Sequence, residues 1–227
     1  MEFELSLSQE KNTQLTKLVE LFLDWNGKLN LSAIRDEEGV RVKHVIDSLY
    51  ISKFLDFSQF KNCLDMGTGG GFPALPLGII FPHLHVTACD ATQKKIRAVA
   101  AISEDLDLKN FEAISGRAEE LAKDLNYREQ YDLVTARAVA YLPTLLEWLS
   151  PFVKKGGIIA CYKKDDYEEE LKMSEQAMKE LSLELEEVYK YELSEETGKR
   201  SLIVFTKTKN ISKMFPRGVG VAKTKPL

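Results

Sequence analysis

A run of alternate glycines that follows a short apolar segment most constrains how this chain can fold. Residues 62–66 predict a buried strand, and Gly67, Gly69 and Gly71 follow it directly. Residues 73–81 then have the composition of a helix. Because glycine tolerates positive φ and carries no Cβ, such a strand–turn–helix unit lets a ligand approach the backbone at the helix N-terminus. The unit is typical of nucleotide-type cofactor sites, although an ordinary strand–helix turn has the same pattern.

The spacing of these glycines argues against a dinucleotide fingerprint. That motif needs glycine or alanine at position 72, where Phe72 stands. Asp65 lies two residues before the first glycine. The resulting pattern, Asp-x-Gly-x-Gly-x-Gly, resembles the first motif of S-adenosylmethionine-dependent methyltransferases.

Strand-like and helix-like segments alternate from residue 61 to residue 182, which predicts a parallel sheet with right-handed crossovers. The expected strands are 62–66, 84–89, 111–115, 131–136, 157–162, 185–193 and 201–207, and the main expected helices are 73–81, 92–105, 142–152 and 166–182. Amphipathic periodicity over 8–29 and 36–55 predicts a helical cap before the first strand. We therefore expect a Rossmann-like α/β methyltransferase fold with a mostly parallel seven-stranded sheet and a terminal antiparallel strand. The expected units are a cap at 1–58, a methyltransferase domain at 59–207 and a basic tail at 208–227.

Composition favours a cytoplasmic protein without a membrane segment or a metal site. Of 227 residues, 44% are hydrophobic, and no run approaches the roughly 18 apolar residues that a membrane span needs. The acidic N-terminus lacks the layout of a secretory signal. Cys63, Cys89 and Cys161 are far apart in expected strands, which is typical of a reducing compartment rather than of a disulfide frame or a zinc site.

Charge is distributed unevenly along the chain. The net charge is −4, but residues 207–227 contain six Lys or Arg and no acid, whereas 165–196 contain thirteen acids and three lysines. A basic tail on an acidic protein can bind a polyanion locally, or it can be a solvated terminus.

Two loops after expected strands carry candidate cofactor residues. Asp90 ends the second strand, where a carboxylate can accept both ribose hydroxyls of a nucleoside cofactor or cap the next helix. Ala118 and Glu119 follow the third strand, where they could contact an adenine ring. Glu119 could equally be a first-turn acid favoured by the helix dipole.

Arg137, His44 and Asp47 are further candidates. Arg137 directly follows an apolar strand end, so it needs either a ligand or a salt bridge, for which Asp65 and Asp90 are candidates. His44 and Asp47 lie three residues apart on one helix face, either as a proton-transfer pair or as a structural hydrogen-bonding pair. The fourth strand lacks the Asn/Asp-Pro-Pro-aromatic motif of amine methylation, and no cysteine follows a proline as in C5 methylation of cytosine.

Five segments, in order, carry a more specific resemblance. They are NLSAI (30–34), HVIDSL (44–49), DMGTGGGFP (65–73), RAE (117–119) and RAVA (137–140). Together they resemble the bacterial small-subunit ribosomal RNA N7-guanine methyltransferases, also called the glucose-inhibited division protein B family. The resemblance extends over roughly 20–207. It implies cofactor contacts at Gly67, Phe72, Ala118, Glu119 and Arg137, with Arg137 in a positioning role. Gly69 in the glycine turn and Asp90, which falls where a second-strand acid is expected, complete the predicted cofactor residues.

The resemblance also implies a reaction and a partner. The cofactor is S-adenosylmethionine, and the methyl acceptor is N7 of a guanine in 16S rRNA of the small ribosomal subunit. Separately from the resemblance, we expect a monomer, although the sequence leaves the oligomeric state open. Residues expected to contact RNA are Asn30, Ser32, Arg35, Lys43, His44, Lys163 and Arg217. The tail departs from the usual Tyr-Pro-Arg-Lys-x-Gly, since Phe215-Pro216-Arg217-Gly218-Val219-Gly220 loses a tyrosine hydroxyl and a lysine.

Neutral guanine has an unprotonated lone pair at N7, so this reaction needs alignment and no general base, which agrees with the lack of an obvious acid–base pair. Two alternatives remain open from the sequence: a methyltransferase for another RNA, a protein or a small molecule, and a non-catalytic nucleotide- or RNA-binding module.

Overall fold

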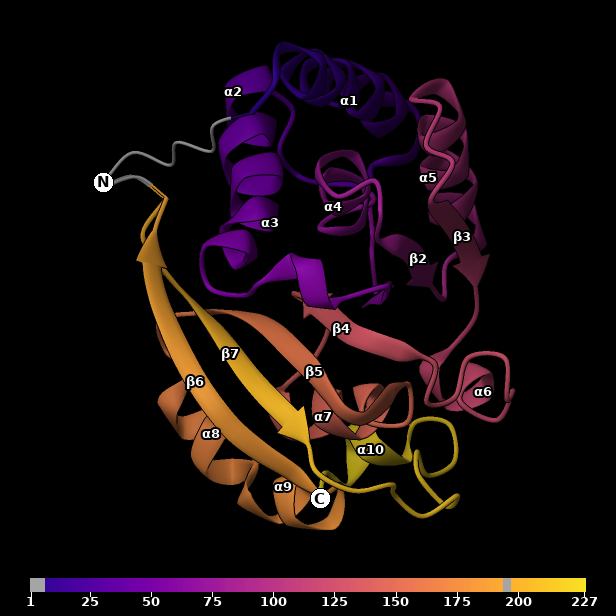
Figure 1. Ribbon diagram of the computed structural model, residues 1–227, viewed down its shortest axis with the longest axis vertical. Helices are drawn as coiled ribbons and strands as arrows, with labels where there is room; N and C mark the ends of the chain where they lie inside the picture. The colour runs from indigo at the N-terminus through magenta and orange to yellow at the C-terminus, as the bar shows by residue number, and fades with distance from the viewer. Residues whose placement is uncertain (1–6, 194–196) are drawn as a thin grey trace.

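One seven-stranded sheet organises the computed structural model, which describes residues 7–193 and 197–227 (Figure 1). The strand order is β3-β2-β1-β4-β5-β7-β6. The strands are β1 (Asn62–Met66), β2 (His85–Asp90), β3 (Phe111–Ser115), β4 (Tyr131–Arg137), β5 (Val153–Lys164), β6 (Leu183–Glu192) and β7 (Lys199–Lys207). Strands β3 to β5 pair in parallel, and β7 runs antiparallel to both of its neighbours. The predicted mostly parallel sheet with an antiparallel strand near the chain end is confirmed.

Helices cover both faces of this sheet (Figure 1). One face lies under α4 (Ala74–Ile80) and α5 (Gln93–Asp105), on which α1 (Gln9–Leu29) packs, and the other lies under α6 (Ala118–Leu121), α7 (Leu142–Leu149), α8 (Glu168–Met173) and α9 (Glu175–Glu180). The remaining helices are short: α2 (Glu37–Val40), the π-helical η1 (Arg41–Ile46), α3 (Asp47–Leu49), the 3₁₀ turns η2 (Tyr50–Lys53) and η3 (Phe57–Gln59), and α10 (Val221–Thr224). Each face therefore has its own apolar core.

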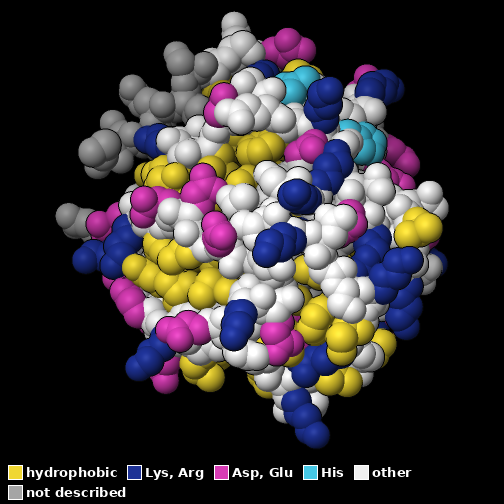
Figure 2. Space-filling view, turned by 60° about the horizontal axis from the view of Figure 1, so that its bottom comes forward, with side chains coloured by type: hydrophobic (Ala, Val, Ile, Leu, Met, Phe, Trp, Pro, Cys, Tyr) yellow, Lys and Arg dark blue, Asp and Glu magenta, His cyan; other side chains and the backbone are white. Residues whose placement is uncertain are grey.

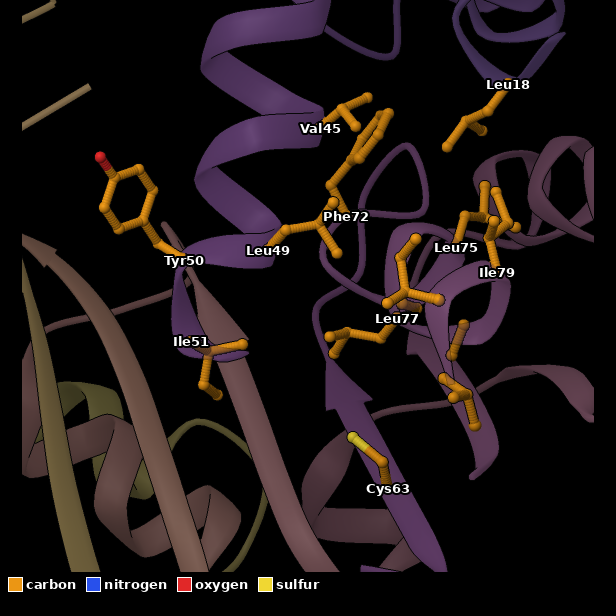
Figure 3. Close-up of a cluster of buried hydrophobic side chains, with 14 of the residues drawn as sticks. Leu18, Val45, Leu49, Tyr50, Ile51, Cys63, Phe72, Leu75, Leu77 and Ile79 are labelled. Atoms are coloured by element: carbon orange, nitrogen blue, oxygen red, sulfur yellow. The ribbon is translucent and has the colours of Figure 1, made fainter. Parts of the chain in front are cut away.

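The N-terminal helices share a core with the sheet domain. Leu18 of α1 and Val45 and Leu49 of the next helical segment are buried, and they point toward Phe72 and Leu75 beyond the glycine turn (Figure 3). Burying one such side chain contributes about 1.5–3 kcal/mol. This packing fixes residues 9–53 against the sheet edge at which the parallel strands end.

Two expected helices differ from the observed ones. The expected helix over 166–182 is divided into α8 and α9 at Ser174, whose hydroxyl donates to the Glu170 carbonyl oxygen at 2.7 Å. Such a bond back to the preceding turn competes with regular helix geometry. The expected helix over 36–55 instead contains a π-helical segment, in which each turn holds an extra residue. Amphipathic periodicity does not reveal either irregularity.

The C-terminal segment 208–227 is attached to the α7 side of the sheet. Arg217 donates to both carboxylate oxygens of Glu147, which is fully buried on α7. Phe215 and Ala222 are buried, and Arg128 donates to the carbonyl oxygen of Phe215 at 2.8 Å. The face in Figure 2 shows basic, acidic and apolar side chains interspersed rather than one uniform basic surface. The basic residues of the tail are therefore only partly available for solvent or a polyanion.

In the described part of the chain, no helix has both the length and the apolar character that crossing a membrane requires.

We expect Arg217→Gln to lower the free energy of unfolding by about 3 kcal/mol, because it leaves the buried Glu147 carboxylate without its cation. Urea denaturation of the full chain measures this. Lys213→Gln removes the same charge from an exposed position of the same tail and serves as the control. The double variant Glu147→Gln/Arg217→Gln should recover most of the loss. Equal stabilities of Arg217→Gln and Lys213→Gln would show that the ion pair does not hold the tail.

Candidate cofactor and substrate cavity

The glycine turn after β1 forms the wall of a cavity of about 840 Å³ at the edge where the parallel strands end. Gly67 has φ +77°, and a Cβ there would lie 2.5 Å from Cγ2 of Val139. The N–H groups of Gly67 and Thr68 donate to the Cys89 carbonyl oxygen at 2.8 and 2.9 Å, which ties the turn to β2. Any other residue at position 67 would be strained by the positive φ and would have to displace Val139.

Asp90 connects the turn to the start of α5. Its Oδ2 accepts the Gly69 N–H at 3.1 Å, and its Oδ1 accepts the Thr92 N–H at 2.8 Å. Each carboxylate oxygen can accept a second hydrogen bond, and Asp90 lines the cavity. The side chain thus supports the start of α5 and still offers acceptors to a diol. Helix capping and ribose binding, the two functions considered from the sequence, are therefore compatible.

Glu119 is buried and, together with Ala118, lines the cavity from the start of α6, which follows β3. Its Oε1 accepts the Gly220 N–H at 3.1 Å. The C-terminal segment therefore contacts a residue of the cavity wall, which no local sequence signal indicates because the two residues are 101 positions apart.

Arg137 is the last residue of β4, and its salt-bridge partner is neither Asp65 nor Asp90. Its Nη1 donates to Oδ2 of Asp47 at 2.8 Å and to the Lys43 carbonyl oxygen at 3.1 Å. Neither Asp65 nor Asp90 forms a salt bridge with it among the described residues. The expectation of Asp65 or Asp90 was wrong because α3 places Asp47 directly against the end of β4.

His44 lies between this guanidinium and the loop that follows α1. Nη2 of Arg137 donates to His44 Nδ1 at 3.2 Å, and His44 Nε2 lies 2.8 Å from Oγ of Ser32. The imidazole stacks on Phe72, with the ring centroids 4.9 Å apart. Burial first, and then the Arg137 charge, lower the pKa of His44 from 6.5 to about 4. His44 is therefore neutral near pH 7.

The geometry favours a structural function of His44 and Asp47 over a proton-transfer pair. Both side chains accept hydrogen bonds from Arg137, which lies on the sheet. The other Asp47 oxygen, Oδ1, accepts the Tyr191 hydroxyl at 2.8 Å. Three segments, the cap, β4 and β6, thus meet at one carboxylate.

The structure brings most of the expected RNA contacts to the cavity but leaves three outside. Ser32, Lys43, His44 and Lys163 line it. The Nζ of Lys163 is 2.6 Å from Oε2 of Glu170, so this lysine already has an anionic partner. Asn30 and Arg35 are not lining residues; they bond each other at 2.5 Å. Arg217 lies at Glu147 instead, so we assign it to tail attachment rather than to RNA.

Sequence reasoning missed two residues of the cavity wall and one buried acid that attaches the C-terminal segment. Tyr191 and Arg200 line the cavity from the β6–β7 hairpin, and nothing local distinguishes them from other strand residues. Glu147 could have been found, because it is an acid on the apolar face of the expected helix 142–152 and therefore needs a buried partner.

The chemistry of the cavity fits S-adenosylmethionine. All seven expected cofactor residues line it, and its volume lies within the roughly 300–1,000 Å³ of small-molecule sites. Oγ1 of Thr68, in the glycine turn, and Oδ2 of Asp65 beneath it are buried without a hydrogen-bond partner in the described structure. Burial raises the pKa of Asp65 to about 6, and it raises the pKa values of Cys89 and Cys161 to about 12. The described residues contain no group of three or more His, Cys, Asp or Glu that could hold a metal.

The sheet order, the glycine turn and the acid at the end of β2 define the class of S-adenosylmethionine-dependent methyltransferases. Solved structures share this fold. A *Bacillus cereus* O-methyltransferase in complex with SAH aligns with a TM-score of 0.58 at 16% identity, over 84% of this chain and 90% of that one. A putative O-methyltransferase from *Klebsiella pneumoniae* aligns with a TM-score of 0.57 at 14% identity, over 85% of this chain and 90% of that one.

Sequence comparison defines the family within this class. Residues 11–202 match the family described as rRNA small subunit methyltransferase G. A *Lysinibacillus sphaericus* protein named ribosomal RNA small subunit methyltransferase G is 43% identical over 98% of this chain and 94% of its own length. The *Bacillus subtilis* protein of that name is 39% identical over 98% and 93%. The chain belongs to this family, and the predicted resemblance is confirmed.

We expect Gly67→Ala to weaken binding of S-adenosylmethionine about ten-fold or more, because the added Cβ must displace Val139 and the turn. Isothermal titration calorimetry measures the affinity. Gly156→Ala is the matched control: Gly156 also has positive φ, but a Cβ there meets nothing within 4 Å and the residue is not in the cavity wall. An unchanged affinity of Gly67→Ala, with the fold intact by thermal melting, would contradict this assignment.

The pKa of His44 predicts a pH dependence of stability. The folded protein resists protonation of His44 until about pH 4, whereas the unfolded chain takes up this proton near pH 6.5. The His44 contribution to stability should therefore fall by up to about 3 kcal/mol as the pH decreases from 6.5 to 4. Asp65, whose pKa burial raises to about 6, contributes with the opposite sign over this range, so the difference between wild type and variant is the readout. In urea denaturation across this range, His44→Gln should lose less stability than the wild type as the pH decreases. His85→Gln alters an exposed histidine and should match the wild type; a parallel decrease in all three proteins would contradict the prediction.

Proposed function

We propose that this protein transfers the methyl group of S-adenosylmethionine to N7 of a guanine in 16S rRNA of the small ribosomal subunit. The observation that carries the proposal is the similarity to ribosomal RNA small subunit methyltransferases G over 98% of the chain. We further propose that the protein works as a monomer in the cytoplasm, where ribosomal RNA is found.

The choice of N7 as the acceptor atom agrees with the state of the candidate general bases, whose side chains are already engaged. His44 uses both ring nitrogens, toward Arg137 and Ser32. Asp47 accepts from Arg137 and Tyr191. Neither His44 nor Asp47 is therefore an available general base in the cavity wall, and the N7 lone pair of neutral guanine needs none.

The residues of the cavity have separable functions in this proposal. S-adenosylmethionine, when bound, supplies an electrophilic methyl group. The glycine turn and Asp90 hold the nucleoside, and Ala118 and Glu119 form the wall near its base. Phe72, stacked on His44, closes the cavity between the glycine turn and the cap, and it excludes water from the site of transfer. Arg137 orients the reactants and takes no proton. Alignment of this kind can supply about 7–11 kcal/mol.

Three cations at the cavity are suited to RNA phosphates. Lys43 on η1, Lys164 on β5 and Arg200 on β7 line it, and none forms a salt bridge with another described residue. Lys164 and Arg200 are direct cross-strand partners. Like charges in this arrangement repel, so an anion bound between them would relieve that repulsion. We therefore propose that they contact phosphates beside the target guanine, which must lie in an unpaired loop because A-form helices hide N7 in a deep groove.

We expect labelled S-adenosylmethionine to transfer methyl to small-subunit RNA, and cleavage at N7-methylguanine to map one modified base. The assay should compare assembled small subunits with naked rRNA. Label in protein, in another base atom or in large-subunit RNA would contradict the proposed substrate.

Matched variants distinguish loss of S-adenosylmethionine binding from loss of RNA binding in this assay. Asp90→Asn should weaken S-adenosylmethionine binding. Lys164→Gln/Arg200→Gln should leave that affinity near the wild-type value, raise KM for RNA and reduce the salt dependence of RNA binding by about one to two counterions. Lys213→Gln, at an exposed tail position outside the cavity wall, is the control for charge removal. Equal effects of both charge changes on KM would contradict the assignment of Lys164 and Arg200.

A further inference from the structure

Arg137 presents a charge problem for the ligands of this cavity. Its guanidinium lies in the cavity wall, and its side chain is only 14% exposed. The methyl donor carries a positive sulfonium, and a guanine methylated at N7 is itself cationic. In a partly desolvated site, an uncompensated guanidinium would repel both of them. The charge of Arg137 therefore needs a compensating anion in the cavity wall.

Asp47 supplies that balance. Oδ2 of Asp47 is 2.8 Å from Nη1 of Arg137, and the carboxylate is only 8% exposed. It forms the one salt bridge of Arg137 within the described ranges 7–193 and 197–227. His44, the other side chain that accepts from the guanidinium, is neutral near pH 7 because its pKa is lowered to about 4. The group as a whole therefore carries no net charge.

The remaining contacts hold this carboxylate in place. The Tyr191 hydroxyl donates to Oδ1 of Asp47 at 2.8 Å, and the Tyr191 ring stacks on Tyr50 with the centroids 4.4 Å apart. Burial, followed by the charge of Asp47, raises the pKa of Tyr191 far above its usual value, so the phenol remains a hydrogen-bond donor. Tyr191 thus orients Asp47 without altering the charge of the site.

We propose that Asp47 determines the preference of the cavity for the cationic methyl donor over the neutral thioether that remains after transfer. S-adenosylmethionine and S-adenosylhomocysteine differ by one methyl group and one positive charge. Neutralising Arg137 removes a repulsion that only the charged ligand experiences. Asp47 is therefore a specificity-determining residue that acts through Arg137, and it favours release of the by-product. This inference rests on the proposed use of S-adenosylmethionine.

The test measures the affinities of both sulfur ligands by isothermal titration calorimetry in the wild type and in Asp47→Asn. Asparagine keeps the shape of the side chain and can still accept from Arg137, but it removes the charge. We expect the Kd of S-adenosylmethionine to rise about ten-fold and that of S-adenosylhomocysteine to change less than about two-fold. The ratio of the two Kd values is the readout, and a merely structural function of Asp47 would not move it.

Three further variants make the test decisive. Asp47→Asn/Arg137→Gln removes both charges and should return the ratio toward the wild-type value. Tyr191→Phe removes a hydrogen bond without removing a charge, so it should weaken both ligands by the same factor. Arg137→Gln alone should move the ratio in the opposite direction, toward S-adenosylmethionine, and it decides the question if Asp47→Asn fails to fold.

Equal changes for the two ligands in Asp47→Asn, or an unchanged ratio in Arg137→Gln, would overturn this inference while leaving the proposed function intact. Failure of the wild type to bind either ligand would instead contradict the proposed function. The two failures are thus distinguishable within one set of titrations.

Discussion

The ion pair between Arg137 and Asp47 is the interaction on which the arrangement of the cavity depends. Arg137 comes from the sheet, Asp47 comes from the cap, and Tyr191, which bonds the same carboxylate, comes from the hairpin. Removing one member of such a partly buried group leaves a charge or a polar atom without a partner. The pair therefore keeps the cap, the parallel strands and the β6–β7 hairpin in one relative position, and the cavity lies where they meet.

Other buried charges attach the C-terminal part of the chain in a similar way. The Nζ of Lys207 is fully buried at the end of β7 and bonds Glu129 at 2.9 Å and the carbonyl oxygens of Ser150 and Val153. Arg217 bonds Glu147. A sequence with six cations in its last 21 residues suggests a free basic tail, but two of these cations are used inside the protein. Net charge along a sequence thus does not by itself predict which charges reach solvent.

Much of the fold was predictable because it follows from local rules. Strands 111–115 and 62–66 were placed at their observed bounds, since alternation of apolar runs with turn residues marks such strands. The glycine turn and Asp90 were assigned to one site because the ends of neighbouring parallel strands share an edge. The break at Ser174 and the π-helical segment were not predictable, because one hydrogen bond or one extra residue per turn leaves the apolar periodicity almost unchanged.

The sequence by itself determined the family, and it predicted residues that the structure brings together in one cavity wall. Glycines at 67, 69 and 71 permit the positive φ values that the turn has, and Asp90 ends the neighbouring parallel strand, so both lie at the same edge of the sheet. Only the tertiary structure decided the partners of the charged side chains: Arg137 with Asp47, Tyr191 with Asp47, and Gly220 with Glu119. These partners are 90, 144 and 101 residues apart. Side-chain type shows that a buried charge needs a partner, but only the folded chain determines which candidate comes within hydrogen-bonding distance.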